Sequence, residues 1–419
     1  QFKWTGDALT NNWYTQTNWK GGVPNLTLST VIPNSLNTGR IYPEVTSGTC
    51  SVKNITIESA ASLKISEAVL QVAGTITNNG ILSVELGTVQ FMGTTPQTIS
   101  DGTFTANRVK HLIISNDVNL TSVDTLLGTL TVDAGKTFTT NDQLILKSDS
   151  AGTARIAALP VDGAGNATAF INGKIIIERF IPLRKAWRLL SAPVKTLNAP
   201  TINAAWQEGL NTQSANSNLY PGYGVMIQGG DTLNGFDRGL TTNSSIKIFD
   251  SVSGSFKGLP AIPGTHTAIT NYPGYFLYSR GDRSVNLMHG NAAVSTKATL
   301  RIKGEVNTGK VVAPVNAKGF SVFGNPFASA IDFATLTRNN VNNSFYVWDP
   351  QLAGLNGLGG YVAFSWNAGT GSYDATSSVS PLSQYIQSGT AIMVESLDTA
   401  VAGSITVKES DKTSNGADQ

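Results

Sequence analysis

The sequence predicts an all-β protein in which a parallel β-helix-like stack of repeats is followed by a β-sandwich or jelly-roll-like domain. Short β-prone runs recur between Thr49 and Leu159, and the units advance by about 15–22 residues, as stacked supersecondary units do. Only 13% of the residues are charged, and Gly, Asn, Asp and Ser separate most of the runs. Helical patterns are confined to 330–336 and 380–386, a turn or two each. Together these observations favour turn-rich β architecture.

The repeat covers residues 49–165. Each run is too short to bury its apolar side chains alone, so neighbouring runs must stack on one another. We expect Leu, Ile and Val to point inward and Thr, Ser and Asn to point outward, as in a parallel β-helix. The runs on which this prediction rests are 54–57, 62–65, 69–72, 81–84, 88–91, 111–114, 128–132 and 143–146.

Residues 1–48 form an entry segment that contains Trp4, Trp13 and Trp19. Large aromatic side chains usually bury, and a repeat stack needs a cover over its open end, so a hydrophobic cap is the favoured interpretation. Two alternatives stay open. The rings form a sugar-stacking platform, or the segment docks on a neighbouring chain as an assembly interface. A head-to-tail contact of that second kind builds filaments.

The repeat loses its spacing after Leu159, and a turn-rich break places the domain boundary between Asp162 and Gly173. Residues 173–407 are predicted to form the β-sandwich domain, because strand runs follow one another without alternating helices. The polar segment 408–419 is predicted to be a linker. The expected strands include 223–227, 245–249, 274–278, 299–302, 320–323, 344–348, 361–364 and 391–395.

Sequence motifs of catalysis are missing. The three histidines, His111, His266 and His289, have no zinc-ligand spacing, and neither a nucleophile elbow nor a P-loop is present. A polysaccharide-cleaving β-helix enzyme needs acidic and basic side chains clustered on one face of successive coils. The charged residues of the repeat do not recur at equivalent positions of successive coils, so they do not form such a cluster. We therefore predict no enzymatic activity, no cofactor and no metal, and polysaccharide cleavage is the most distant hypothesis.

Three further features have structural interpretations. Asp231, Asn234 and Asp237 lie in a glycine-rich string, but their spacing of three does not match a calcium loop, so a hairpin loop is favoured. The Arg-Gly-Asp tripeptide ending at Asp282 is interpreted as a turn. Cys50 is the single cysteine, so no internal disulfide forms, and we interpret it as a buried hydrophobic residue.

The charge balance narrows the classes of partner. The chain has 29 basic and 27 acidic residues, a net charge of +2, and no basic run. It therefore lacks the electrostatic footprint of a protein that binds nucleic acid or an anionic membrane surface. No apolar stretch reaches the about 18 residues of a membrane span. Expected partners are copies of this chain, other cell-surface proteins or glycans.

Short motifs spread over nearly the whole chain form a specific set, at 4–6, 18–19, 23–24, 31–33, 176–182, 186–193, 202–207, 281–284, 324–333, 345–350 and 359–361. As a set they resemble Bacteroidetes surface proteins, often adhesin-like, that the type IX secretion system exports. The resemblance implies contact with that secretion machinery, export through the outer membrane and an extracellular or cell-surface location. It implies no catalytic residue.

The resemblance also implies a modification. Several short motifs of this sequence, each an Asp followed by Ser or Thr and then by an aliphatic residue, resemble the O-glycosylation sites of Bacteroidetes proteins. Sugars attached at surface turns are tolerated and increase solubility. The candidate O-glycosylation sites are Thr125, Ser150, Thr232, Ser251 and Thr399.

Two functions compete. The first is an extracellular structural or adhesive surface protein, self-assembling into a fibre or filament through β-helix ends, whose unpaired ladder groups can template another chain. The alternative is a carbohydrate-binding surface module, because aromatic faces stack on sugar rings and sandwich loops can present them. The candidate glycan-contact residues are Tyr220, Tyr223, Phe236, Trp366 and Tyr373.

Overall fold

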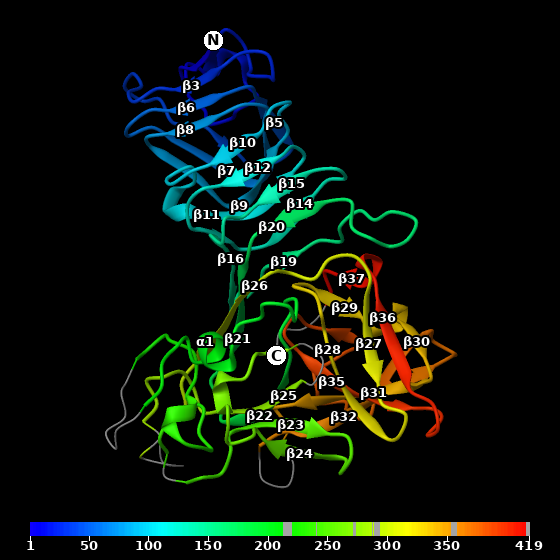
Figure 1. Ribbon diagram of the computed structural model, residues 1–419. Coiled ribbons are helices and arrows are strands. Elements are labelled where there is room, and N and C mark those ends of the chain that lie inside the picture. The colour runs from blue at the N-terminus through cyan, green and yellow to red at the C-terminus, as the bar shows by residue number, and fades with distance from the viewer. Residues whose placement is uncertain are drawn as a thin grey trace. The chain divides into compact units, whose positions relative to one another are not determined.

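The computed structural model describes residues 1–212, 220–239, 241–270, 274–286, 288, 294–352 and 358–415 (Figure 1). The chain divides into two compact units. The first comprises Gln1–Lys147 and Ala154–Ile175, and the second comprises Ser148–Thr153 and the chain from Ile176 on. The entry segment and the repeats thus belong to one unit. Nearly all regular structure is β, and in the described ranges α1 (Ile202–Trp206) is the one α-helix.

The first unit is a parallel β-helix, as predicted from the repeat. Its early coils contribute one sheet of order β2-β1-β3-β6-β8, formed by β2 (Trp19–Lys20), β1 (Phe2–Trp4), β3 (Thr30–Ile32), β6 (Ile55–Ile57) and β8 (Ile76–Asn78). Its later coils contribute the order β10-β12-β15-β20, formed by β10 (Gln97–Ile99), β12 (Val118–Leu120), β15 (Thr137–Thr139) and β20 (Phe170–Asn172).

The remaining strands of this unit form one long parallel sheet. They are β4 (Glu44–Val45), β5 (Thr49–Val52), β7 (Ser62–Val72), β9 (Ile81–Phe91), β11 (Arg108–Ile114), β13 (Asp124–Leu126), β14 (Thr129–Val132), β16 (Leu144–Leu146) and β19 (Arg155–Ile156). The first half of β7 pairs with β4 and its second half with β5, so the sheet bends along its length into two faces. A coil therefore shows three faces in all.

The bend depends on backbone conformation at the corner between the two halves. Glu67, in the middle of β7, has φ +57°. Gly87 lies at the matching corner of β9, where a Cβ atom would come within 2.7 Å of the Ile65 carbonyl oxygen of the preceding coil. Only glycine permits so close an approach between coils.

The interior of the stack is filled by the alternate residues of each short strand. Leu63, Ile65, Leu70 and Val72 of β7 are all 0% exposed, while Lys64 and Gln71 between them face outward. This period of two is what the sequence pattern predicted, because successive side chains of a strand point to opposite faces.

The second unit contains antiparallel sheets stacked as a sandwich. One has the order β22-β25-β23-β24, with β22 (Ala186–Leu190), β25 (Tyr275–Ser279), β23 (Ile246–Asp250) and β24 (Ser255–Gly258). The central sheet has the order β28-β35-β31-β32-β33, with β28 (Phe320–Gly324), β35 (Ala391–Ser396), β31 (Val341–Asp349), β32 (Gly360–Asn367) and β33 (Ser372–Ala375).

Smaller elements complete this unit. Two three-stranded sheets are formed by β27 (Val311–Val315), β36 (Gly403–Val407) and β30 (Thr337–Asn339), and by β34 (Tyr385–Ile386), β29 (Ala330–Asp332) and β37 (Lys412–Thr413). The other strands are β17 (Ser148–Asp149), β18 (Gly152–Thr153), β21 (Ile175–Ile181) and β26 (Ala298–Gly304). The described 3-10 turns of the two units are η1 (Gln16–Asn18), η2 (Thr105–Asn107), η3 (Thr232–Asn234), η4 (Gly264–His266), η6 (Phe333–Thr335) and η7 (Glu409–Asp411).

The central sheet contributes side chains from both of its faces to apolar cores. Phe345 and Val347 of β31 belong to the larger apolar core, with Phe327, Phe333 and Phe364 among its members. Tyr346 and Trp348 of the same strand pack instead against the smaller core, which contains Leu189, Phe276 and Met393. The alternation along one strand therefore separates two cores, and the second of them lies between this sheet and the β22-β25-β23-β24 sheet.

Three sequence expectations differ from the structure. No strand forms at 223–227, because Val225 and Ile227 donate their amides to the Trp206 carbonyl and the Asp237 carboxylate instead of to a sheet. Of the two helical segments expected, 330–336 forms the strand β29 and only the single 3-10 turn η6, and 380–386 has no helix and ends in β34.

The segment 408–413 is part of the fold and not a linker. β37 pairs with β29. Lys412 and Glu409 form a 2.7 Å ion pair with both side chains 2% exposed.

Candidate functional site

An aromatic groove in the second unit is the strongest candidate for a binding site. It has a volume of about 320 Å³ and lies between the β23–β24 hairpin and the central sheet. The hairpin contributes Phe249, Gly254 and Phe256, and the central sheet contributes Phe320, Tyr346, Tyr361 and Met393. This volume and an apolar lining are typical of pockets that hold small molecules.

The groove rings belong to a larger network of aromatic contacts. Phe256 packs on Phe276 with ring centroids 4.9 Å apart, and Phe320 packs on Tyr346 at 5.4 Å. Tyr361 packs edge-on against Trp348 at 4.9 Å. Phe320 and Tyr361 remain 37% and 41% exposed. The rings are thus held in place by the core beneath while two of them face solvent.

The side chains of the groove offer few kinds of interaction to a ligand. Among the described residues its lining contains no charged side chain, and its polar side-chain atoms are the hydroxyls of Tyr346 and Tyr361. A ligand suited to this lining is uncharged, presents an apolar ring face and has a hydrogen-bonding group at its edge. Sequence reasoning missed this site, since the β23–β24 hairpin and the strands of the central sheet that form it lie far apart along the chain.

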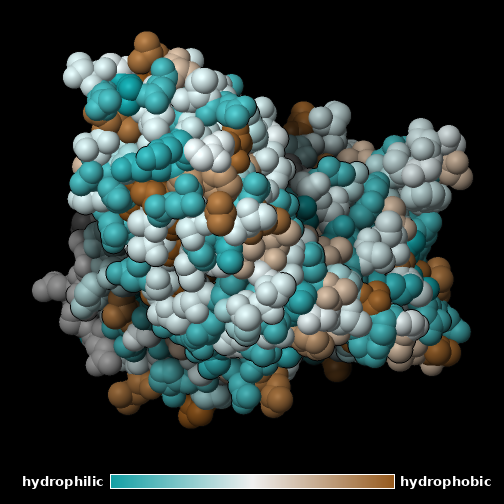
Figure 2. Space-filling model, turned by 90° about the horizontal axis from the view of Figure 1, so that it is seen from above, coloured by the Kyte–Doolittle hydropathy of each residue, from teal (hydrophilic) through white to brown (hydrophobic). Residues whose placement is uncertain are grey.

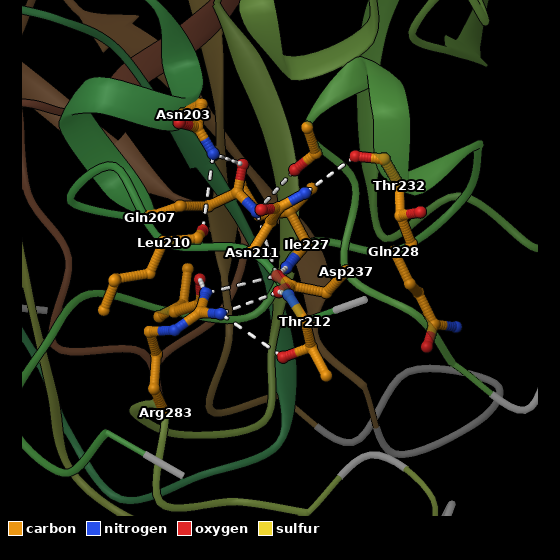
Figure 3. Close-up of polar contacts among 12 residues, drawn as sticks. Asn203, Gln207, Leu210, Asn211, Thr212, Ile227, Gln228, Thr232, Asp237 and Arg283 are labelled. Atoms are coloured by element: carbon orange, nitrogen blue, oxygen red, sulfur yellow. Dashed lines mark hydrogen bonds and ion pairs between the residues drawn. The ribbon is translucent and has the colours of Figure 1, made fainter. Parts of the chain in front are cut away.

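A buried ion pair organises the loops at another part of the same unit. Arg283 and Asp237 are both 0% exposed in their side chains, and the Arg283 Nη2 atom lies 2.7 Å from the Asp237 Oδ1 atom (Figure 3). Asp237 also accepts hydrogen bonds from the amides of Thr212 and Ile227 and from Gln207 Nε2. Because every acceptor position is used by the protein, this pair fixes loops and is not available to a ligand.

The aspartates of the glycine-rich string and of the Arg-Gly-Asp tripeptide form hydrogen bonds and ion pairs within the protein. Asp237 is committed to Arg283, and Asp231 caps η3 by accepting from the Leu233 amide. Within the described ranges no group of three His, Cys, Asp or Glu side chains gathers as metal ligands would. Asp282 accepts hydrogen bonds from Ser284, Thr296 and the Gly222 amide. Although burial opposes its charge, these bonds hold its pKa below the usual value. The tripeptide is a structural turn.

The glycan-contact candidates divide into buried and exposed residues. Phe236 is 0% exposed and Tyr373 is 8% exposed, so the expectation that they stack on a sugar is wrong: both rings are covered by the protein. Tyr223 and Trp366 are 52% and 39% exposed. Tyr220 packs on Tyr223 at 6.5 Å, and Trp366 packs on Tyr373 at 5.3 Å. These two pairs are not in the groove lining.

The three tryptophans of the entry segment are buried within the first unit. Trp4, Trp13 and Trp19 are 0%, 1% and 6% exposed, and Trp19 packs edge-on against both others at 4.9 and 4.6 Å. Trp19 Nε1 donates to the Trp13 carbonyl at 2.7 Å. With β2 and β1 at the end of their sheet, this cluster is a cap over the first coil. The rings themselves do not offer a platform for a sugar or for another chain.

Four of the five candidate O-glycosylation sites share one local geometry. The Oδ1 atoms of Asp149, Asp231, Asp250 and Asp398 each accept from the amide two residues on, at 2.8, 2.9, 3.2 and 2.8 Å. Ser150, Ser251 and Thr399 between them are exposed, and Thr232 is half-buried. Thr125 differs, because it lies in β13 beside the buried Asp124.

The remaining reactive side chains have structural surroundings. Cys50 is 1% exposed, and burial raises the pKa of its thiol to about 12. His111 Nδ1 accepts from the Thr129 amide at 3.0 Å, and burial, followed by the nearby Lys110 and Arg155, lowers the pKa of its imidazole. His266 lies in η4, and His289 lies outside the described residues.

Comparisons with known proteins add no relative: no family model, no curated protein and no solved structure matches the chain. Among the described residues, no helix has the length and apolar content that crossing a bilayer requires.

Proposed function

We propose that this protein is an extracellular structural or adhesive surface protein, in which the β-helix serves as a rigid support. The observation that carries the proposal is the organisation of the first unit: stacked coils with a mainly apolar interior, side-chain hydrogen bonds between successive coils on the exterior and a capped first coil. Stacked repeats bury a continuous core and have the character of a one-dimensional rod. A support of this kind needs no catalytic residue.

The exterior of the coils supports a load-bearing role. Ser51, Gln71, Gln90 and Ser115 form a ladder across four successive coils, with hydrogen bonds of 2.8, 2.9 and 2.9 Å. Side-chain amides of this kind tie each coil to the next without charges, so salt does not screen them. Figure 2 shows the molecule from above, with hydrophilic side chains widespread on this face and hydrophobic ones scattered among them.

The proposal extends to self-assembly through a coil end. In the folded chain the first coil is closed by β2, an antiparallel strand of two residues, which leaves almost no ladder for another chain to extend. Assembly at this end therefore requires β2 to be released or to be a partner's docking point. Negative-stain microscopy with light scattering on protein from the native cell surface tests this: ordered filaments support it, and monodisperse monomers remove the filament form of the proposal.

Export and glycosylation belong to the same proposal and rest on the sequence resemblance. Ser150, Ser251 and Thr399 are the favoured O-glycosylation sites, because each is exposed within a turn that its Asp closes. Mass spectrometry of peptides from the natively exported protein tests them, and unmodified peptides at all three would remove the modification. Protease treatment of intact cells tests the surface location, which requires cleavage without lysis.

Carbohydrate binding is the second candidate function, and the aromatic groove is the observation that favours it. The C–H face of a neutral sugar ring matches rings that are half-exposed and uncharged, such as Phe320 and Tyr361. Glycan-array binding followed by calorimetry tests it with Tyr361→Ala, which removes a groove ring, and Trp366→Ala as matched control outside the groove. Loss of binding in the first variant alone supports the groove. Loss in the control alone would assign the exposed Trp366 instead.

A further inference from the structure

The aromatic groove offers few hydrogen-bonding groups to a sugar. Its described lining contains two side-chain hydroxyls, those of Tyr346 and Tyr361. The rest of the lining is apolar, apart from main-chain atoms at the hairpin turn, and comprises Phe249, Gly254, Phe256, Phe320 and Met393. An ordinary hexose, by contrast, carries hydroxyls around its whole ring. The groove therefore cannot pair every hydroxyl of a hexose that enters it edge-on.

The groove has an apolar floor and a rim that faces solvent. Met393 is 8% exposed and lies on β35, between β28 and β31 in the central sheet, so it forms part of the floor. Phe320 and Tyr361 are 37% and 41% exposed and form part of the rim. The volume of about 320 Å³ is at the small end of the range for ligand pockets. One sugar residue fits such a space, with its outer edge left in water.

The apolar floor determines which edge of a sugar can enter. A hydroxyl that loses its water and finds no partner lowers the affinity, whereas a methyl group gains from burial against apolar side chains. A sugar that presents a methyl group to the floor therefore avoids the loss and adds a favourable contact. An acetamido group also carries a methyl group, but its N–H and C=O both require partners of their own. A 6-deoxyhexose has the methyl group without that requirement.

We infer that the aromatic groove binds the terminal residue of a glycan and selects a 6-deoxyhexose. The C6 methyl group packs on the apolar floor at Met393, and the ring hydroxyls lie at the rim, where Tyr361 and water serve as their partners. This inference rests on the carbohydrate-binding function proposed above and adds the class of sugar. Acidic sugars are excluded from the class, because the described lining has no cationic side chain to pair with a carboxylate.

The test compares sugars that differ by one hydroxyl, on the full chain, by calorimetry and saturation-transfer NMR. Methyl α-L-fucoside is paired with methyl α-L-galactoside, and methyl α-L-rhamnoside with methyl α-L-mannoside. In at least one pair the 6-deoxy member should bind about 10- to 100-fold more tightly, with the strongest saturation at its C6 methyl protons. Equal affinities within both pairs, or no binding of any of the four, would overturn the inference. The glycan array reports separately on carbohydrate binding, which stands if other glycans bind.

Three variants locate the selectivity in the groove. Tyr361→Ala removes a rim ring and should weaken binding of the 6-deoxy sugar at least 10-fold, whereas Trp366→Ala, outside the groove, should leave it unchanged. Tyr361→Phe keeps the ring and removes one hydroxyl, so both members of a pair should lose affinity while their ratio persists. Thermal unfolding confirms that each variant is folded. Wild-type affinity in Tyr361→Ala, or a ratio that falls to one in Tyr361→Phe, would overturn the inference.

Discussion

Asp124 provides the sharpest test of how the β-helix interior is built. It is the first residue of β13, its side chain points inward and is 1% exposed, and neither carboxylate oxygen has a hydrogen-bond partner. Burial, and secondarily the charge of Asp101, raise its pKa to about 7. The folded protein therefore holds Asp124 as a neutral acid below that pH. The perturbation we consider is Asp124→Asn, which keeps the shape and removes the titration.

The sign and size of the effect follow from proton linkage. The folded-state pKa lies above the unfolded value of about 4, so the stability contribution is complete below pH 4 and is lost as pH rises through about 7. A difference of about three pKa units corresponds to about 4 kcal/mol, and local relaxation around the ionised group reduces this to about 2–4 kcal/mol. The unfolding free energy of the wild-type chain should fall by that amount between pH 4 and pH 8 relative to Asp124→Asn.

The assay is urea denaturation of both proteins from pH 4 to pH 8. Hydrogen exchange of peptides from 118–146 assigns the transition to the first unit, because a chain of two units need not unfold in one step. The buried amide of Asp124→Asn also changes the unfolding free energy, but by an amount that does not depend on pH. The pH dependence of the difference between the two proteins therefore reports the titration of Asp124 alone. Asp133→Asn, a half-buried carboxyl of the neighbouring β14 turn, is the control. Parallel stability curves for wild type and Asp124→Asn would refute the reasoning.

Three other predictions follow from buried contacts. Arg283→Met should lower the unfolding free energy of the second unit by about 3–5 kcal/mol, because it leaves the Asp237 carboxylate buried without its cation; urea denaturation measures this, and a loss below 1 kcal/mol would contradict it. Gly87→Ala should cost about 1–3 kcal/mol, because the new Cβ meets the Ile65 backbone, whereas Gly163→Ala has open space around it and serves as the control. Cys50 should react with a thiol reagent only after unfolding, because its side chain is buried and burial raises its pKa to about 12; rapid labelling of the native chain would show that the first coils open.

The fold of the repeat region could be predicted from the sequence because the alternation of apolar and polar residues is local and recurs in each coil. Leu63, Ile65, Leu70 and Val72 alternate with polar residues within a few positions of one another, and the same alternation returns in each coil. A strand with one apolar side, repeated at a spacing of about 20 residues, has few ways to bury that side except by stacking. Seven of the eight strand runs expected in the second unit correspond to observed strands for the same local reason, and the run at 223–227 does not.

The candidate sites were not predictable in this way. Phe236 and Tyr373 lie in Gly- and Asn-rich stretches that suggest exposed loops, yet elements distant in sequence cover them. The groove joins Phe256 to Tyr346 and Tyr361. No local pattern marks these pairs, because each residue taken alone resembles an ordinary strand position.

The sequence alone thus determined the class of fold, the alternation of inward and outward residues and the scarcity of catalytic motifs, all of which depend on neighbours a few positions apart. Only the tertiary structure decided which tryptophans and tyrosines are covered, which charges are buried and where cavities remain. Those properties depend on contacts between strands up to about two hundred residues apart, and burial sets their energy.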